Sequence, residues 1–425
     1  MPKAGPRPVA RLGVRRAAPL RGMWMLGPAL VAGVAYLDPG NVASNMTAGA
    51  RYGYLLVWVV LAGNIMAWLI QYLSAKLGVV TGQSLPEVLG TRIRNRWARR
   101  AYWLQAELVA MATDIAEVLG GAVALYLLFD IPLLLGGAIT GAVSMVLLAV
   151  QTRRGPRHFE FVIIGLMLII VIGFVAGLFV APPDPAGVLG GMVPRFDDSG
   201  SVLLAASILG ATIMPHAIYA HSALTRDRFP ARGPGADSRR PSLRTLLTVT
   251  RWDVTIAMVI AGSVNLAILL LAAANLAGVE GTDSLEGAYA AISDNLGAVI
   301  GTLFAVGLLA SGLASTSVGA YAGAEIMHGL LTIRIPLLAR RLVTLIPALI
   351  ILGIGFDPTL ALVLSQVVLS FGIPFALVPL VALTAQRRTL GEHANRPLTT
   401  VLGVVFAALL IALNAVLLWL VATGA

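Results

Sequence analysis

The sequence predicts an all-α integral membrane protein with eleven transmembrane helices, arranged as two inverted five-helix repeats plus one extra helix. Three observations lead to this fold class: the composition, the number of long apolar stretches, and two interrupted stretches at matching positions. Of the 425 residues, 58% are hydrophobic and 12% are charged, whereas a soluble domain usually carries about 25% charged residues. The composition therefore excludes a soluble protein.

The apolar stretches define the expected spans, because about 20 apolar residues cross the hydrocarbon core as a helix. The eleven expected spans cover residues 27–48, 54–77, 102–128, 132–151, 159–181, 201–224, 252–276, 289–320, 338–355, 358–384 and 398–422.

The basic residues test this count, since Lys and Arg concentrate in cytoplasmic loops of membrane proteins. With a cytoplasmic N-terminus, all of the 30 Lys and Arg residues except Arg51 and Arg195 fall in inside segments. A wrong number of spans would invert every later loop, so this alternation supports eleven spans and places the C-terminus outside. The expected location is the plasma membrane.

The chain divides into five segments. A basic cytoplasmic tail, 1–26, runs into the first span without a small-residue cleavage pattern, so no removable signal peptide is expected. The expected repeats are 27–181 and 201–384, separated by an extracellular loop at 182–200. A linker near 226–250, rich in Pro, Gly and Arg, lies within the second repeat. A cytoplasmic loop and the last span form 385–425.

Two expected spans contain helix-breaking residues: Asp38-Pro39-Gly40-Asn41 in the first, and the segment from Ala211 to Met214-Pro215-His216 in the sixth. Irregular backbone at membrane depth is tolerated where it lines a cavity or packs against protein. The breaks open two successive five-span units, and an odd number of spans inverts the second unit, as in inverted-repeat transporters. Ordinary proline kinks are the alternative, but the polar residues at both breaks favour a binding site.

The residues at the breaks indicate which ion such a site would take. Asp38 offers a carboxylate, Asn41 an amide oxygen, Ala211 a free backbone carbonyl and Met214 a thioether. Oxygen ligands suit Mg²⁺ or Ca²⁺, whereas a thioether favours transition metals, so the set points to Mn²⁺ or Fe²⁺ and their neighbours. Gln366, in an otherwise apolar span, either faces the same cavity or bonds a neighbouring helix.

A second set of polar residues lies on the third span. Glu107, Asp114 and Glu117 follow at spacings of seven and three, which puts them near one helical face. Chains of buried acids and histidines are typical of proton relays, which His216 and His221 would join. The alternative is a structural network paired with Arg340 or Arg341, and both descriptions can hold together.

Several classes are excluded or disfavoured. The chain has no cysteine, so thiolate metal sites and iron–sulfur clusters are impossible. The basic residues lie between apolar runs, which argues against nucleic acid. No nucleophile–base pair or cofactor fingerprint appears, so neither an enzyme nor a cofactor is expected. An organic-solute symporter is disfavoured because Asp38 would repel a substrate carboxylate, and a metal sensor or structural protein because long cytoplasmic domains are absent.

These residues resemble the Nramp divalent-metal transporters. The resemblance rests on the stretch from Gly27 through Asp38-Pro39-Gly40-Asn41, on Met214-Pro215-His216, and on the segment from Ser365 through Gln366 to Ser370, and it covers essentially all eleven spans. It implies the sodium-symporter-like, LeuT-type fold and proton-linked uptake of Mn²⁺ and Fe²⁺. One departure is Ala217, where many relatives have Asn after Met-Pro-His.

The resemblance also implies roles for individual residues. The metal site falls on Asp38, Asn41, the Ala211 carbonyl and the Met214 sulfur, with Gln366 joining in some conformations. The proton and salt-bridge network comprises Glu107, Asp114, Glu117, His216, His221 and Arg341. The expected partners are divalent metal ions, protons and the lipid bilayer. Oligomeric state has no signature in the sequence, and a monomer is compatible with it.

Overall fold

The computed structural model describes residues 27–154, 156–229, 241–333 and 336–423. The expected cytoplasmic tail, 1–26, and the centre of the expected linker, 230–240, lie outside these residues. Within the described ranges all regular elements are helices, and there is no β-strand. The all-α class is therefore confirmed.

Helices occupy all eleven expected segments. The first is divided into α2 (Pro28–Val34), the 3-10 helix η1 (Ala35–Leu37) and α3 (Pro39–Tyr52), and the sixth into α10 (Ser199–Thr212) and α11 (Pro215–Arg228). The remaining nine are α4 (Val57–Thr81), α6 (Arg96–Phe129), α7 (Leu133–Arg154), α8 (Pro156–Val180), α12 (Leu243–Asn275), α14 (Ala298–Leu331), α15 (Leu337–Gly353), α16 (Pro358–Ala385) and α18 (Pro397–Thr423). By length and composition, eight helical segments among the described residues can cross a membrane, so the number eleven stays a prediction.

The eighth expected span, 289–320, is wrong at its start. A separate helix, α13 (Leu285–Leu296), ends before Gly297, which has a φ of 93° and caps the start of α14 at Ala298. This left-handed backbone suits glycine and stops the helix. The apolar pattern alone did not reveal the stop, and α14 runs on to Leu331.

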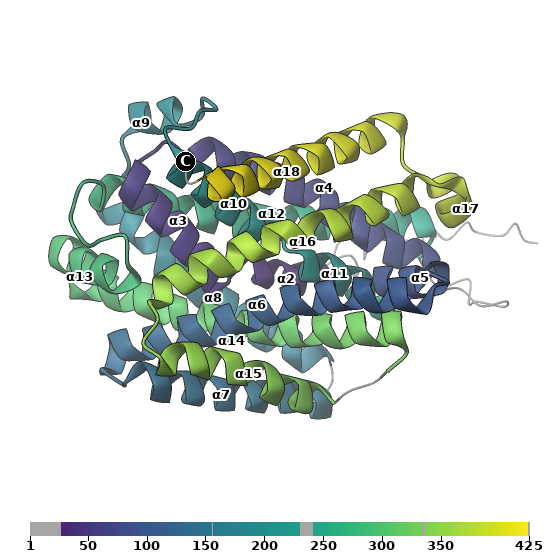
Figure 1. The fold of residues 1–425 in the computed structure, drawn as a ribbon, viewed down its shortest axis with the longest axis horizontal. Coiled ribbons are helices and arrows are strands. Elements are labelled where there is room, and N and C mark those ends of the chain that lie inside the picture. Colours follow the sequence, from purple (N-terminus) through teal and green to yellow (C-terminus); the bar gives the residue numbers. More distant parts are fainter. Residues whose placement is uncertain (1–26, 155, 230–240, 334–335, 424–425) are drawn as a thin grey trace, which may run out of the picture.

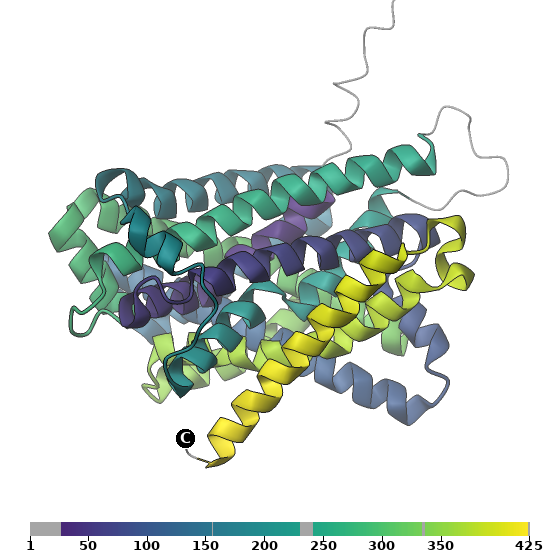
Figure 2. The same ribbon diagram turned by 90° about the horizontal axis from the view of Figure 1, so that it is seen from above.

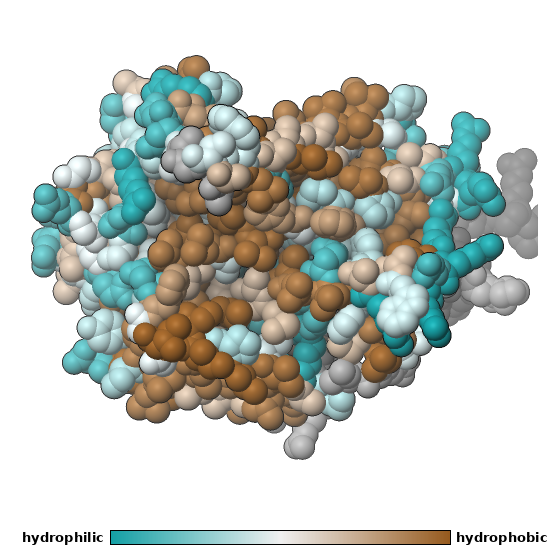
Figure 3. Space-filling model, in the orientation of Figure 1, coloured by the Kyte–Doolittle hydropathy of each residue, from teal (hydrophilic) through white to brown (hydrophobic). Residues whose placement is uncertain are grey.

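The long helices run between the two ends of the molecule (Figures 1 and 2). The short helices α5 (Leu85–Arg92) and α17 (Arg387–Leu390) lie at one end, and α9 (Pro185–Gly190) and α13 lie at the other (Figure 1). Apolar side chains cover much of the middle of the visible face, and polar ones gather towards the ends (Figure 3). Such a band is what a lipid bilayer requires.

The packing follows a repeat symmetry. Counterparts in the two expected repeats pack on each other: α4 on α12, α6 on α14, and α7 on α15. Contacts between the repeats also have counterparts with the repeats exchanged. The fifth helix of each repeat packs on the third of the other, as α8 does on α14 and α16 on α6. The second half of each broken helix packs on the second helix of the other repeat, as α3 does on α12 and α11 on α4. The broken helices therefore occupy equivalent places. The extra helix α18 packs outside, on α16 and α10 (Figure 2).

Candidate metal site

The first break is built by Asp38 and Pro39. Asp38 has extended backbone and caps α3, because its Oδ1 accepts a hydrogen bond of 2.8 Å from the Asn41 backbone N–H. Proline suits the first position of a helix, where no N–H is needed, and it keeps the preceding residue extended. The cap thus fixes the Asp38 carboxylate at the N-terminal end of α3, which favours negative charge.

The second break frees a carbonyl oxygen. Helix α10 ends at Thr212, Met214 lies at the N-cap of α11, and Pro215 opens α11. In a continuous helix, the N–H of residue 215 would bond the carbonyl of Ala211, but proline has no N–H. The Ala211 carbonyl instead accepts a hydrogen bond of 2.9 Å from Asn41 Nδ2. Both interruptions predicted from the sequence are confirmed, and they meet.

Side chains from three helices converge at this meeting point. Asn41 Nδ2 donates to Asp38 Oδ1 at 2.8 Å as well as to the Ala211 carbonyl. Gln366 of α16 donates from Nε2 to Asp38 Oδ2 at 3.2 Å. These residues and Met214 all have 0% exposed surface. The structure therefore brings four of the five expected ligand residues into one hydrogen-bonded cluster, and it buries Met214 at the same break.

The cluster has unused capacity for a cation. Among the described residues, Asp38 has no Lys or Arg ion-pair partner, and the amide oxygens Asn41 Oδ1 and Gln366 Oε1 have no hydrogen-bond donor. A buried carboxylate and buried acceptors without donors are costly. A divalent metal ion would neutralise the charge and satisfy both amide oxygens.

Glycine permits the close approach of α16. A Cβ added at Gly40 would lie 1.8 Å from Gln366 Nε2, and one added at Gly120 of α6 would lie 2.0 Å from Cβ of Pro39. A larger residue at Gly40 would displace the Gln366 side chain, and one at Gly120 would push Pro39 away. These glycines allow α16 and α6 to close over the first break.

The acidic residues of α6 face two arginines of α15. Arg341 Nη1 lies 2.9 Å from Asp114 Oδ1 and 3.2 Å from Glu117 Oε2. Arg340 lies 2.9 Å from Glu107 Oε1 and 3.1 Å from Asp114 Oδ2. The predicted common face of the acids is present, and so is the pairing with arginine. With all five groups ionised, the three carboxylates and two guanidiniums would carry one excess negative charge.

The two histidines of α11 have different neighbours. His216 Nδ1 lies 3.2 Å from Thr113 Oγ1, next to Asp114 on α6. His221 Nδ1 lies 2.7 Å from Gln71 Oε1 of α4. The structure therefore brings His216 to the acidic helix, whereas His221 belongs to a separate polar chain. Ala217, the departure from the family pattern, is buried beside His216.

Sequence reasoning missed the partners of His221 and of the first break. Gln71 Nε2 donates to the Tyr36 hydroxyl, so that Tyr36, Gln71 and His221 form a hydrogen-bonded chain. Asn265 of α12 donates to the Tyr36 carbonyl at 3.0 Å, and Ser311 of α14 donates to the Leu37 carbonyl. The sequence shows that these polar residues lie in apolar spans, but it does not show which residue each one bonds.

Charged contacts outside the predicted site hold the far ends of both broken helices. At the end of α3, Arg51 Nη2 lies 2.6 Å from Asp283 Oδ2. At the end of α11, Arg226 lies 2.8 Å from Glu87 Oε1 and 3.1 Å from Glu325 Oε2. Burial is the largest single influence and raises the pKa of Glu87, but the hydrogen bonds and charge of Arg226 and the hydrogen bonds of Ser84 together outweigh it, so the pKa lies below its ordinary value. This pair is ionised at neutral pH.

No group of three or more His, Cys, Asp or Glu side chains in the described part of the chain is arranged to hold a metal ion. The candidate site differs from such a cluster because it has one carboxylate, two amides, a carbonyl and a thioether. A mixed set of this kind, between two interrupted helices, is the arrangement of an ion-carrying membrane transporter. The fold and the site together define that class of protein.

Comparisons with known proteins give the family. The model of the Nramp family, described as natural resistance-associated macrophage protein-like, matches residues 29–420. The chain is 60% identical over 401 residues to the divalent metal cation transporter MntH of Mycobacterium tuberculosis, covering 94% of this chain and 92% of that protein. Identity to the MntH protein of Bacillus subtilis is 46% over 396 residues, covering 92% and 91%. The chain therefore belongs to the Nramp family, which consists of membrane transporters and not of enzymes.

Solved structures agree with this assignment. A crystal structure of the Eremococcus coleocola manganese transporter superposes with a TM-score of 0.83 at 31% identity, covering 95% of this chain and 88% of that one. The structure of MhsT in complex with L-phenylalanine has a TM-score of 0.61 at 14% identity, covering 92% and 97%. That second likeness shows the fold alone, and the expected LeuT-type fold is confirmed.

Proposed function

We propose that this chain is a secondary transporter that imports divalent transition-metal ions, including Mn²⁺ and Fe²⁺, by alternating access coupled to protons. One observation carries the proposal: the buried Asp38 carboxylate lies between two interrupted helices, without a cationic partner among the described residues and beside two amide oxygens that lack donors. The names of the relatives, a divalent metal cation transporter and a manganese transporter, support the same substrate class.

The proposed ligands are the Asp38 carboxylate, the amide oxygens of Asn41 and Gln366, the Ala211 carbonyl and the Met214 sulfur. The amide nitrogens of Asn41 and Gln366 now donate to Asp38. A half-turn of each terminal amide would present its oxygen to an ion held by Asp38. The thioether makes the set softer than one of oxygen alone, which disfavours Mg²⁺ and Ca²⁺.

Burial of the proposed ligands supports alternating access. The proposed ligands are fully buried, so an ion reaches them only when helices move. The contacts of Arg51 and Arg226 at opposite ends of the broken helices would break and reform in turn. An inside-negative potential favours import by about 2.3 kcal/mol per charge per 100 mV.

The proposed proton route uses the charge imbalance of the α6–α15 network. Because the network has one more carboxylate than guanidinium, one of the three acids Glu107, Asp114 and Glu117 can bind a proton. His216 links the second break to Thr113, next to Asp114, so it connects the metal site with the network. Binding of a metal at Asp38 would displace a proton towards these acids and then to the cytoplasm.

The proposed orientation places the N-terminus in the cytoplasm and the C-terminus outside the cell. Support comes from the arginines in α5 and α17, whereas Asp184 caps α9 and Asp283 directly precedes the cap of α13, at the other end of the molecule (Figure 1). A cysteine introduced at Thr389 of this cysteine-free chain should react with a membrane-impermeant thiol reagent only from the cytoplasmic side. Labelling of intact cells would contradict the orientation.

The decisive experiment is Mn²⁺ uptake into proteoliposomes that contain a metal-sensitive dye under an inside-negative potential. Asp38→Ala should lower the uptake rate at least about 100-fold, because the only charged ligand is removed. Asp197→Ala, which removes an exposed carboxylate at the α9 end, is the matched control and should transport normally. Equal rates for Asp38→Ala and the native protein would refute the proposal and favour an organic-solute symporter.

A further inference from the structure

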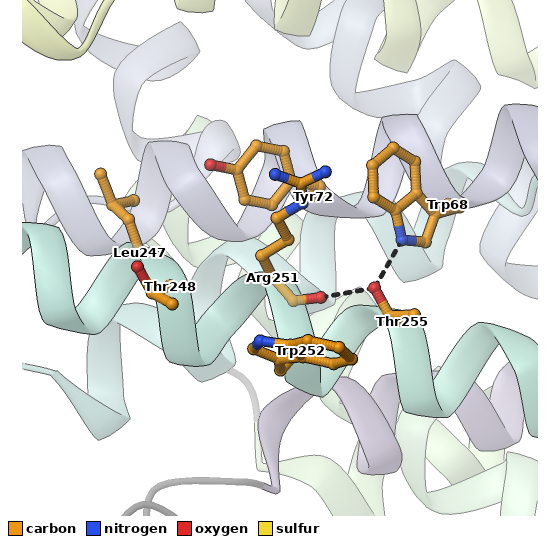
Figure 4. Close-up of a pocket in the computed structure, with 7 residues that line it drawn as sticks. All are labelled: Trp68, Tyr72, Leu247, Thr248, Arg251, Trp252 and Thr255. Atoms are coloured by element: carbon orange, nitrogen blue, oxygen red, sulfur yellow. Dashed lines mark hydrogen bonds between the residues drawn. The ribbon is translucent and has the colours of Figure 1, made fainter.

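A groove outside the transport site lies between α4 and α12 (Figure 4). Its volume is about 600 Å³, and it is lined by Trp68 and Tyr72 of α4 and by residues of α12. The α12 residues are Leu247, Thr248, Arg251, Trp252 and Thr255. In Figure 4 the Arg251 side chain extends from α12 towards the rings of Trp68 and Tyr72 on α4.

The groove continues towards the beginning of α18. A neighbouring cavity of about 540 Å³ shares Trp68, Tyr72, Leu247 and Arg251, and it is also lined by Lys76, His393 and Arg396. We call the combined surface the basic groove. The C-terminal part of α4 and the N-terminal parts of α12 and α18 therefore meet around three cationic side chains.

These cations are not neutralised by neighbouring acids. Within the described residues, no carboxylate forms an ion pair with Lys76, Arg251 or Arg396. Asp253 is buried on another face of α12, where it accepts from the backbone N–H groups of Gly27 and Ala29 at 3.2 and 2.9 Å. Glu392 lies 3.4 Å from His393. The groove keeps a net positive charge.

Aromatic and polar side chains in or beside the walls of the groove position Arg251 and Lys76. The rings of Trp68 and Tyr72 are stacked with centroids 6.3 Å apart, and Arg251 Cζ lies 5.7 Å from the centre of the Trp68 ring. Trp68 Nε1 also donates to Thr255 Oγ1 at 2.9 Å (Figure 4). Lys76 Nζ donates to Asn395 Oδ1 at 3.0 Å. Among the described residues the Arg251 guanidinium has this ring contact but no hydrogen bond or ion pair, so its N–H groups can donate to a ligand.

The groove opens where the apolar band of the molecule begins. Trp252 is 63% exposed, and the next turns of the same helices expose Ile256 and Val259 on α12 and Leu398 and Val401 on α18. Tryptophan and tyrosine are enriched at the boundary between lipid and water. A ligand for this place needs an anionic head for the arginines and apolar chains for the surface beyond them.

We propose that the basic groove binds an anionic phospholipid, with its phosphate between Arg251, Lys76 and Arg396 and its acyl chains along α12 and α18. Basic pockets between transmembrane helices on the cytoplasmic side recognise anionic headgroups in this way. The bound lipid joins helices from both repeats and the extra helix, but it does not touch the proposed metal ligands.

Native mass spectrometry of the full chain in detergent tests this proposal, with phosphatidylglycerol and phosphatidylcholine added at equal concentrations. The native protein should retain phosphatidylglycerol preferentially. Arg251→Gln should lower this retention about fivefold, and the double variant with Arg396→Gln should lower it further, because each cation contributes about equally. Arg251→Lys, which keeps the charge, should retain most of the binding.

The matched control is Arg244→Gln, since Arg244 is an exposed cation on α12 that does not line the groove. Its lipid retention should equal that of the native protein. Equal retention of the two lipids, or equal losses in Arg244→Gln and Arg251→Gln, would overturn the proposal. Displacement of the lipid by millimolar inorganic phosphate would overturn it as well, since it would identify a site for a soluble anion.

Discussion

Two polar clusters in the core of this protein are both largely buried, yet they differ in how their charge is balanced. Around Asp38, one carboxylate is surrounded by amides and carbonyls and has no ion-pair partner among the described residues. On α6, by contrast, Glu107, Asp114 and Glu117 face two arginines. The first cluster is incomplete without a cation, whereas the second is nearly neutral without any ligand.

The difference shows that a buried charge can serve either binding or structure. A buried ion pair that loses one partner destabilises the fold, because the remaining charge is uncompensated. A buried carboxylate without an ion-pair partner already bears that cost, so removal of its charge alone should relieve the fold while it abolishes binding. The two clusters should therefore respond in opposite ways to the removal of a charge.

Arg341→Ala should have the largest effect on stability. Arg341 is completely buried and contacts Asp114, Glu117, Ser144 and Thr316, so its loss should cost about 3–5 kcal/mol of folding free energy. Thermal unfolding of the purified protein in detergent measures this loss. Asp38→Asn, which removes the charge but keeps a side-chain oxygen to cap α3, should unfold at the native temperature or above, and Arg244→Ala is a control for a surface arginine. Equal destabilisation by Arg341→Ala and Asp38→Asn would remove the distinction between the clusters.

Asp114→Asn should separate metal movement from proton movement. The substitution leaves two carboxylates and two guanidiniums, so the network loses its excess negative charge and its place for a proton. The ion pairs of Arg341 with Glu117 and of Arg340 with Glu107 remain, which should preserve the fold. Proton influx during Mn²⁺ uptake, measured with a dye for internal pH, should fall to the level of liposomes without protein.

Ser144→Ala is the matched control for that experiment, because it removes the hydroxyl that accepts a hydrogen bond of 3.0 Å from Arg341 Nε without a change of charge. Its proton influx should remain close to the native value. Native proton influx in Asp114→Asn would mean that the network is structural only.

The clusters also differ in how much of them could be predicted from the sequence. The breaks at Asp38 and Met214 were predictable because proline acts on its own helix, through a missing N–H four residues after a carbonyl. The common face of Glu107, Asp114 and Glu117 was predictable because the helical period is local as well. Arg341 was expected in the network, but the second arginine, Arg340, was only one of several candidate cations.

Other features depend on tertiary packing and were missed for that reason. His221 was expected with the acids of α6, yet the way α11 packs on α4 places it against Gln71. The stop at Gly297 depends on a left-handed φ that an apolar pattern does not reveal. The contacts of Arg226 with Glu87 and Glu325 join three helices that are distant in sequence. Sequence patterns thus predicted each side chain's own helix better than its partners.

Met214→Ala should have the smallest effect and should change the choice of ion rather than its binding. The loss of the sulfur leaves oxygen ligands, which suit Ca²⁺ and Mg²⁺ as well as Mn²⁺. The preference for Mn²⁺ over Ca²⁺ should fall about tenfold, equivalent to about 1.4 kcal/mol, in a competition assay with liposomes. Met46→Ala, which removes another buried methionine, from α3, should destabilise the fold about as much as Met214→Ala does. It should leave the preference for Mn²⁺ over Ca²⁺ unchanged. If both variants discriminate like the native protein, Met214 only fills space, and the choice of ion depends on Asp38 and the amides.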